Sequence, residues 1–163
     1  MAVKGLFAGS FNPFTYGHLD IVKSASQLFD ILYLCIAVNS DKIKKGEEDS
    51  ETEINKKRKA IEDSIAEAGL TNVKVMYCSG FIAKVCEDLE VDYLVRGLRN
   101  TSDYLYEENI AKINSELNPN LKTIYIRGTN DVISSTLIRE LLRYGEDISK
   151  YVPVPIQELM QSN

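Results

Sequence analysis

Residues 3–18 read VKGLFAGSFNPFTYGH, a short apolar run that leads into a loop bracketed by Gly9 and Gly17. The run from Val3 to Ala8 has the length and composition of a buried strand. After the loop, apolar residues recur at three- and four-residue spacing from Leu19 to Phe29, which predicts a helix. The stretch therefore predicts the first strand–loop–helix unit of an α/β domain.

The rest of the chain repeats this alternation. Ile31 to Val38 is nearly all apolar, which is typical of a strand in a parallel sheet covered on both faces. Further strands are predicted at 73–78, 91–95 and 121–127, and helices at 54–68, 81–89, 102–117, 134–144 and from Ile156. Together these segments predict a single domain over residues 1–163, with a doubly wound parallel sheet of five strands. The polar residues 39–52 predict a surface loop.

The composition excludes several classes of protein. The chain has 163 residues, of which 44% are hydrophobic, and a formal net charge of −5. This balance argues against a dedicated nucleic-acid binder, whose binding face is usually basic. No apolar run approaches the ~20 residues of a membrane span, and no signal peptide precedes the first strand, so we expect a cytoplasmic protein.

The three cysteines are Cys35, Cys78 and Cys86, and the chain has a single histidine, His18. Cys35 and Cys78 fall in strand-like apolar runs, which predicts buried, reduced thiols. A zinc site would need more ligands than these scattered residues supply.

The loop from Gly9 to His18 has the features of an anion-binding site. Gly9 can adopt backbone angles that a side chain forbids, and it lets a phosphate approach the main chain. Gly17 and His18 open the next helix, whose unpaired N–H groups and dipole favour anions and a neutral imidazole. Ser10 adds a hydroxyl. The residues alone fit an anion site, and they equally fit a plain turn that His18 caps.

Cationic and hydroxyl side chains follow later strands. A tight turn at Gly97 would let Arg96 and Arg99 converge on one polyanion, although a solvated basic turn is an even alternative. The run 134–136 (Ser-Ser-Thr) offers hydroxyls and free N–H groups at a helix start, and it is also an ordinary N-cap. We expect these residues to share one site, because such sheets bind ligands beyond the carboxyl ends of their strands.

The first loop resembles the signature of the nucleotidylyltransferase superfamily, with Thr15-x-Gly17-His18 preceded by Gly-Ser-Phe-x-Pro. Thr15, where many members have His, resembles the phosphopantetheine adenylyltransferase branch. Three later segments match motifs of this branch in order and spacing: Arg96-Gly97-Leu98-Arg99, Tyr106-Glu107, and the Ile-Ser-Ser-Thr-x-x-Arg run at 133–139. The likeness covers nearly the whole chain.

This resemblance implies a Rossmann-like nucleotidylyltransferase fold and an enzyme of coenzyme A biosynthesis. Such an enzyme transfers the adenylyl group of ATP to 4′-phosphopantetheine and gives dephospho-coenzyme A and pyrophosphate. Mg²⁺ would be held mainly by the substrate phosphates rather than by protein ligands. The resemblance also implies a homohexamer and feedback inhibition by coenzyme A.

The resemblance further assigns roles to single residues, with His18 stabilising the transition state. The catalytic residues would be Ser10, His18, Lys42 and Arg99. The ATP-binding residues would be Gly9, Ser10, Phe11, Gly17, His18, Gly97, Leu98, Arg99, Glu107, Asn130, Asp131, Val132, Ile133, Ser134, Ser135 and Thr136. The acceptor would be bound by Ser10, Lys42, Ile82 and Arg96.

Some features depart from the pattern of the branch. Asn12 stands where Asp is more frequent, Tyr16 replaces a small polar residue, and the loop 43–58 is longer and more acidic than usual. One alternative is an adenylyltransferase for nicotinamide mononucleotide, which shares the first loop and the Ile-Ser-Ser-Thr motif. A cytidylyltransferase fits less well, and a non-catalytic sensor of ATP or coenzyme A is a different class. Thr15 and the motifs at 96–99 and 106–107 favour phosphopantetheine.

Overall fold

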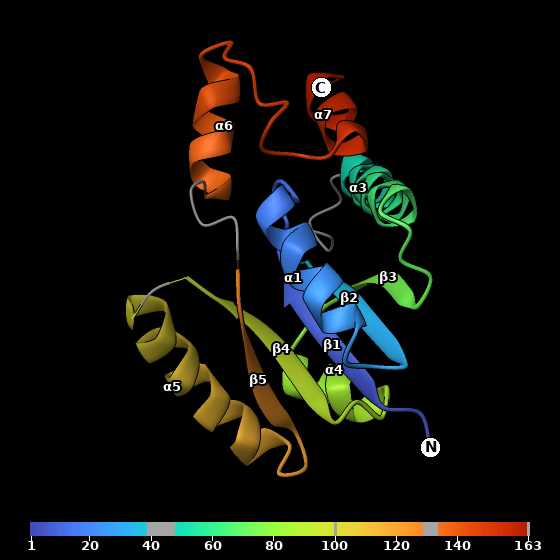
Figure 1. Cartoon of the computed structure of the whole chain (residues 1–163), viewed down its shortest axis with the longest axis vertical. Coiled ribbons are helices and arrows are strands. Elements are labelled where there is room, and N and C mark those ends of the chain that lie inside the picture. Colours follow the sequence, from blue (N-terminus) through green and yellow to red (C-terminus); the bar gives the residue numbers. More distant parts are fainter. Residues whose placement is uncertain (39–47, 100, 129–133, 163) are drawn as a thin grey trace.

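Strands and helices alternate along the chain in the computed structural model (Figure 1), which describes residues 1–38, 48–99, 101–128 and 134–162, with the backbone alone at 48–50. The strands are β1 (Lys4–Gly9), β2 (Ile31–Ala37), β3 (Val73–Cys78), β4 (Tyr93–Leu98) and β5 (Lys122–Arg127). The helices are α1 (Tyr16–Ser26), α3 (Glu48–Glu67), α4 (Ile82–Asp88), α5 (Thr101–Leu117), α6 (Ser135–Arg143) and α7 (Val154–Gln161). Each predicted element has a counterpart, with bounds shifted by a few residues.

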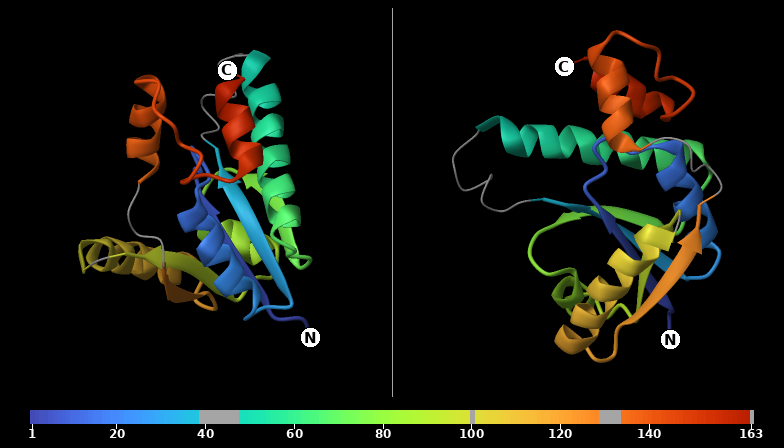
Figure 2. Two further views of the ribbon diagram at one scale, coloured as in Figure 1. Left: turned by 45° about the horizontal axis from the view of Figure 1, so that its top comes forward. Right: turned by 90° about the vertical axis from the view of Figure 1, so that its left-hand side faces the viewer.

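The five strands form one parallel sheet in the order β3-β2-β1-β4-β5. Helices α1 and α3 cover one face and α4 and α5 the other, as the edge-on view in Figure 2 shows. The order of the strands reverses at β1, between β2 and β4. The predicted doubly wound sheet is therefore confirmed, and its topological switch point lies at the end of β1.

Each face of the sheet has its own hydrophobic core. Phe7 and Leu32 point toward α1 and α3, where they pack with Val22 and Ile61, and all four side chains are buried. On the opposite face, Leu6, Cys35 and Leu94 pack against α4 together with Cys78 and Cys86. Neighbouring strand residues alternate between the two cores, which explains why the strands are apolar on both sides. The cysteines are free and buried, as predicted.

The chain after β5 leaves the sheet and covers its carboxyl edge. Helix α6 lies beyond the strand ends, and α7 packs alongside α3 (Figure 1). The buried side chains of Ile138, Ile148, Val152 and Ile156 join the core on the α1 side. The end of the chain thus packs onto the beginning of the fold.

Two boundaries differ from the sequence prediction. Helix α3 begins at Glu48 rather than near Ile54, so residues 48–52 are helical and not part of the predicted surface loop. Apolar residues are sparse in this part, and the helix is supported on its exposed side by pairs such as Arg58–Glu62 and Lys59–Asp63 at i,i+4. The apolar period that the prediction relied on becomes clear only near Ala60, where the helix reaches the core.

The second difference concerns β4, which continues to Leu98. Arg96 and Gly97 are paired with Tyr125 and Ile126 of β5, so the expected tight turn at Gly97 is wrong. A Cβ at Gly97 would stand 3.4 Å from the Ile21 side chain, so the glycine lets α1 approach the strand closely. None of the described helices is both long and apolar enough to cross a membrane.

Candidate active site

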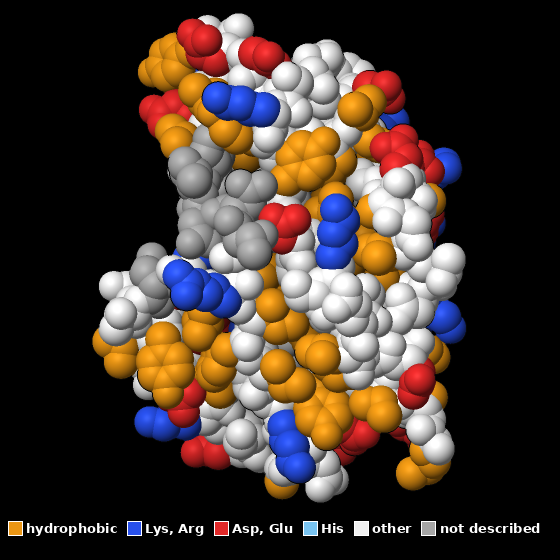
Figure 3. Space-filling view, in the orientation of Figure 1, with side chains coloured by type: hydrophobic (Ala, Val, Ile, Leu, Met, Phe, Trp, Pro, Cys, Tyr) orange, Lys and Arg blue, Asp and Glu red, His pale blue; other side chains and the backbone are white. Residues whose placement is uncertain are grey.

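A cleft of about 400 Å³ lies where the strand order reverses. It is bounded by the ends of β1 and β4 and by the first residues of α1 and α6. In the space-filling view the outline of the molecule is indented between α6 and α5 (Figure 3). The cleft is lined by Phe7, Ala8, Gly9, Ser10, Phe11, Thr15, Gly17, His18, Ile21, Arg96, Gly97, Leu98, Arg99, Gly128, Ser134, Ser135 and Thr136. Most residues that the sequence assigned to a site therefore meet in one place.

Several assigned residues do not line this cleft. Ile82 is the first residue of α4 and packs against the core on the far face of the sheet. Glu107 lies behind Arg96. Lys42, Asn130, Asp131, Val132 and Ile133 lie outside the described residues. Their assignments remain predictions.

His18 is oriented by the N-cap of α1. The Thr15 hydroxyl accepts a hydrogen bond from the His18 N–H at 3.2 Å, and the Thr15 N–H donates to His18 Nδ1 at 3.0 Å. This is the reciprocal capping-box arrangement, with an imidazole at the third helical position in place of the usual Glu or Gln. Because a backbone N–H only donates, Nδ1 is the acceptor and a neutral ring carries its proton on Nε2. No described residue bonds to Nε2, which is left to donate into the cleft.

The surroundings of His18 keep it neutral. Burial, together with the nearby charges of Arg99 and Lys57, lowers the pKa of the imidazole from 6.5 to about 4. The Phe14 ring stacks on it at 5.7 Å between centroids, and the Phe11 ring meets it edge-on at 5.0 Å. His18 is therefore a fixed hydrogen-bond donor at physiological pH.

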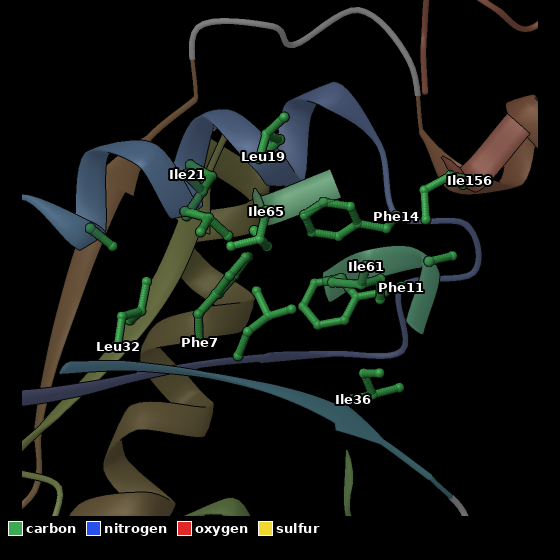
Figure 4. Packing of buried hydrophobic residues seen from close by; sticks show 14 of the residues in the cluster. Phe7, Phe11, Phe14, Leu19, Ile21, Leu32, Ile36, Ile61, Ile65 and Ile156 are labelled. Carbon is green, nitrogen blue, oxygen red and sulfur yellow. The ribbon is translucent and has the colours of Figure 1, made fainter. Parts of the chain in front are cut away.

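The loop before α1 is held by its own aromatic side chains. Phe11 and Phe14 are both buried and point into the core near Ile61 and Ile156 (Figure 4). Phe11 has a left-handed backbone with φ of +47°, a conformation that costs roughly 1–3 kcal/mol in a non-glycine residue. Burial of the ring, which is 2% exposed, offsets this cost.

One of the two roles expected for Gly9 is wrong, and the approach of a phosphate to its main chain stays a prediction. Its backbone is not in the left-handed region, so conformational freedom does not explain it. A Cβ at Gly9 would instead stand 3.0 Å from the Phe11 ring. The missing side chain therefore makes room for the buried ring that shapes the loop.

Arg96 of β4 and Arg99, the residue after its end, reach the cleft, and each is paired with a carboxylate of α5. Arg96 donates to both oxygens of Glu107, at 2.6 Å from Nε and 2.8 Å from Nη2, and the Glu107 side chain is nearly buried. Arg99 contacts Asp103 at 3.3 Å in a more exposed setting. Both arginines thus line one cleft through a strand end rather than through a turn, and their convergence on a polyanion stays a prediction.

The start of α6 forms the opposite wall of the cleft. Ser134 is the N-cap, and its hydroxyl accepts from the Leu137 N–H at 3.2 Å. Ser135 and Thr136 follow in the first turn, where backbone N–H groups lack helical partners and favour anions. This wall matches the second predicted anion site.

Sequence reasoning missed two cations beside the loop. Lys57 of α3 donates to the Ser10 carbonyl oxygen, and Arg139 of α6 donates to the Asn12 carbonyl oxygen. Arg139 is the final residue of the Ile-Ser-Ser-Thr-x-x-Arg run, so the motif contained a signal for it. Lys57 stands among other lysines in a polar stretch, and nothing in the sequence distinguished it.

The fold and the cleft define a doubly wound α/β protein in which a neutral histidine and two helix starts face a cleft at the topological switch point. A family model described as cytidylyltransferase-like matches residues 6–141. The phosphopantetheine adenylyltransferase of Streptococcus pneumoniae (strain CGSP14) is 41% identical over 157 residues, which are 94% of this chain and 92% of that protein. The chain belongs to the cytidylyltransferase-like family and, within it, to the phosphopantetheine adenylyltransferases.

Further comparisons agree with this placement. The phosphopantetheine adenylyltransferase of Staphylococcus carnosus (strain TM300) is 32% identical over 160 residues, covering 97% of this chain and 94% of that protein. Among solved structures, a putative nicotinate-nucleotide adenylyltransferase from Vibrio parahaemolyticus has a TM-score of 0.68 at 21% identity. The match covers 99% of this chain and 93% of that one, and it shows that the fold is shared.

Proposed function

We propose that this protein transfers the adenylyl group of ATP to 4′-phosphopantetheine, giving dephospho-coenzyme A and pyrophosphate. The observation that carries the proposal is the neutral His18, which lines the same cleft as Arg99 and the start of α6 and whose Nε2–H has no acceptor among the described residues. The named relatives supply the identity of the acceptor.

The chemistry needs positioned charge more than it needs a base. A phosphate oxygen of the acceptor attacks the α-phosphorus of ATP, and the bond from this phosphorus to the oxygen of the β-phosphate breaks. The nucleophile is already an anion, so no proton has to be removed first. Catalysis then comes from alignment of the two substrates and from donors aimed at the charge of the transition state.

Each of the described residues that line the cleft has its own role in the proposed reaction. His18 donates from Nε2 to the oxygens of the pentavalent phosphorus, and Ser10 orients the incoming phosphate. Arg99 and the first turn of α6 hold the leaving pyrophosphate. We place Lys42 with Ser10 on the acceptor phosphate and residues 130–133 on the ATP side by resemblance.

Mg²⁺ enters this proposal as part of the substrate. Among the described residues, no group of three or more His, Cys, Asp or Glu is arranged to hold a metal ion. The cleft presents cations and N–H groups instead, which suit the phosphates of a MgATP complex whose metal keeps mostly phosphate and water ligands. The metal would neutralise charge on the phosphate oxygens.

The setting of the enzyme completes the proposal. Three free, buried cysteines fit a reducing compartment such as the cytoplasm.

Exposed apolar side chains on α5, including Leu105 and Ile113, suit assembly into a homohexamer. Coenzyme A would act as a feedback inhibitor because it carries the pantetheine arm of the acceptor. Light scattering of the purified protein and inhibition assays test the last two points.

A pyrophosphate-release assay with MgATP tests the reaction itself. Phosphopantetheine and nicotinamide mononucleotide are compared as acceptors at equal concentrations. We expect release with phosphopantetheine and none above background with nicotinamide mononucleotide. The reverse preference would overturn the choice of acceptor, and no release with either would favour a nucleotide sensor.

A further inference from the structure

We propose that Lys57 is a positioning residue of the adenylyl-transfer site: its ammonium group holds the Ser10 carbonyl so that the Phe11 N–H faces the phosphates of ATP. This inference rests on the proposed function and adds a residue to it. It follows from the way in which the loop between β1 and α1 is attached to the rest of the fold.

The carbonyl groups of this loop are drawn to side chains from distant parts of the chain. Lys57 of α3 donates to the Ser10 oxygen, and Arg139 of α6 donates to the Asn12 oxygen. Ser135 donates from its hydroxyl to the Pro13 oxygen at 3.0 Å. A carbonyl oxygen that faced the cleft would repel a triphosphate. These three hydrogen bonds hold the carbonyl oxygens of the loop against side chains instead.

Peptide geometry gives the contact of Lys57 a direction. The Ser10–Phe11 peptide is trans, so the N–H of Phe11 points opposite to the carbonyl that Lys57 holds. Ser10 and Phe11 line the cleft, whereas Lys57 does not. The ammonium therefore approaches the peptide from outside, and the N–H is turned to the inside.

Among the described residues, none accepts a hydrogen bond from the N–H of Phe11. Most backbone N–H groups in a folded protein have an acceptor, and an anion in the cleft that Phe11 lines would supply one. The left-handed backbone of Phe11 belongs to the same arrangement, since it directs the ring into the core and the peptide to the ligand.

Lys57 also brings its charge close to the reacting groups. No described carboxylate lies within ion-pair distance of it, and its charge is felt at His18 in α1. Burial lowers the pKa of Lys57 from 10.5 to about 8, and the guanidinium of Arg139 in α6 contributes to the decrease. The ammonium is thus mostly charged at neutral pH and loses its proton within the range of an enzyme assay.

The test compares Lys57→Met, Lys57→Arg and, as a matched control, Lys56→Met, which removes an exposed charge from the same helix. We expect Lys57→Met to lower kcat/KM for ATP by about 10- to 100-fold, the range for losing a charged hydrogen bond. Lys57→Arg should stay within about threefold of the parent, and Lys56→Met should be unchanged. If Lys57→Met is folded and matches Lys56→Met, the proposal is wrong.

The pH profile separates positioning from a purely structural role. In the parent, kcat/KM should fall as the pH rises through about 8, because this parameter reports the free enzyme and Lys57 then loses its charge. In Lys57→Arg the fall should disappear, since the guanidinium stays protonated. A fall that persists unchanged in Lys57→Arg would overturn the role of this charge.

A binding measurement keeps the inference independent of the acceptor. In ¹H–¹⁵N spectra, inorganic pyrophosphate should shift the Phe11 amide of the parent and of Lys57→Arg strongly, and that of Lys57→Met much less. Equal shifts in all three proteins would contradict the proposal. This experiment remains decisive even if phosphopantetheine proves not to be the acceptor.

Discussion

Two pairs of cations surround the cleft, and they are held in different ways. Arg96 in β4 and Arg99 just after it bind carboxylates of α5. Lys57 and Arg139 come from α3 and α6 and bind backbone carbonyls of the first loop. A carboxylate cancels the charge of its partner, and a carbonyl does not. The first pair therefore fixes the wall of the cleft, while the second pair supplies uncompensated positive charge.

This difference has an energetic consequence. A nearly buried ion pair such as Arg96–Glu107 contributes mainly through the penalty of breaking it, because the remaining charge is left without a partner. A cation on a carbonyl can lose its contact at smaller cost, and it remains available to an anionic ligand. We therefore expect stability to depend most on Arg96, whose ion pair is nearly buried. Phosphate binding should depend more on the pair around the loop and on Arg99, whose ion pair is half exposed.

The largest expected effect is at His18, where the fields of both pairs meet. His18→Ala removes the Nε2–H donor, and we expect kcat to fall by at least about 10²–10³-fold, or ~3–4 kcal/mol, with little change in ATP binding. Steady-state kinetics and ATP titration measure the two quantities. His18→Gln, which keeps an N–H donor, should retain more activity than His18→Ala. A near-normal kcat in the alanine variant would remove His18 from the mechanism.

Next in size is the loss of the paired arginine. Arg96→Met leaves the Glu107 carboxylate nearly buried without its partner, and we expect the free energy of unfolding to fall by about 3 kcal/mol. Urea denaturation measures the change. The double variant Arg96→Met/Glu107→Leu should recover most of the loss, because no isolated charge remains. An unchanged midpoint in the single variant would mean that the two sets of cations do not differ as we describe.

The titration of His18 sharpens the comparison without a change in sequence. It is the only histidine, so its imidazole signals in an NMR titration are unambiguous. We expect a midpoint near pH 4 and the Nε2–H tautomer at neutral pH. The pKa of His18 is lower in the folded protein than in the unfolded chain, so keeping the ring neutral contributes to the free energy of unfolding. This contribution is complete above about pH 6.5 and is lost as the pH falls toward 4. A midpoint near 6.5 would show that neither pair of cations, nor burial, acts on the ring.

The smallest effect on stability is expected at Arg99. Its pair with Asp103 is half exposed, so Arg99→Ala should change the free energy of unfolding by no more than about 1 kcal/mol. The KM for ATP should nevertheless rise, since the guanidinium lines the cleft. Denaturation and kinetics on the same preparation check both parts. A large loss of stability with an unchanged KM would show that Arg99 supports the fold and does not bind ATP.

Much of this architecture could be predicted from the sequence, because local patterns determine it. Uniform apolar strands such as Ile31–Ala37 indicated a sheet covered on both faces, and the Gly9–His18 loop indicated an anion site at a helix start. The first residues of α3, at 48–53, escaped prediction because all of them are polar and the apolar period begins only at Ile54. The extension of β4 through Gly97 escaped because pairing with β5 outweighed the turn preference of glycine.

The contacts of the site that could not be predicted from the sequence share one physical cause. The contacts of Lys57 with Ser10 and of Arg139 with Asn12 join residues 47 and 127 positions apart. Such contacts depend on tertiary packing, which no local pattern encodes. The pairing of Arg96 with Glu107 was likewise hidden, although both residues had been assigned to the site separately.

The chain's last segment has a consequence for how the protein is made. The Tyr16 N–H, in the first turn of α1, donates to the Tyr151 carbonyl at 2.9 Å, and the Phe14 ring packs where Ile156 is buried (Figure 4). The loop between β1 and α1 is synthesised before these partners, and it acquires the contacts only after residues 151–156 have followed. The five-stranded sheet can therefore form before the loop reaches its final packing.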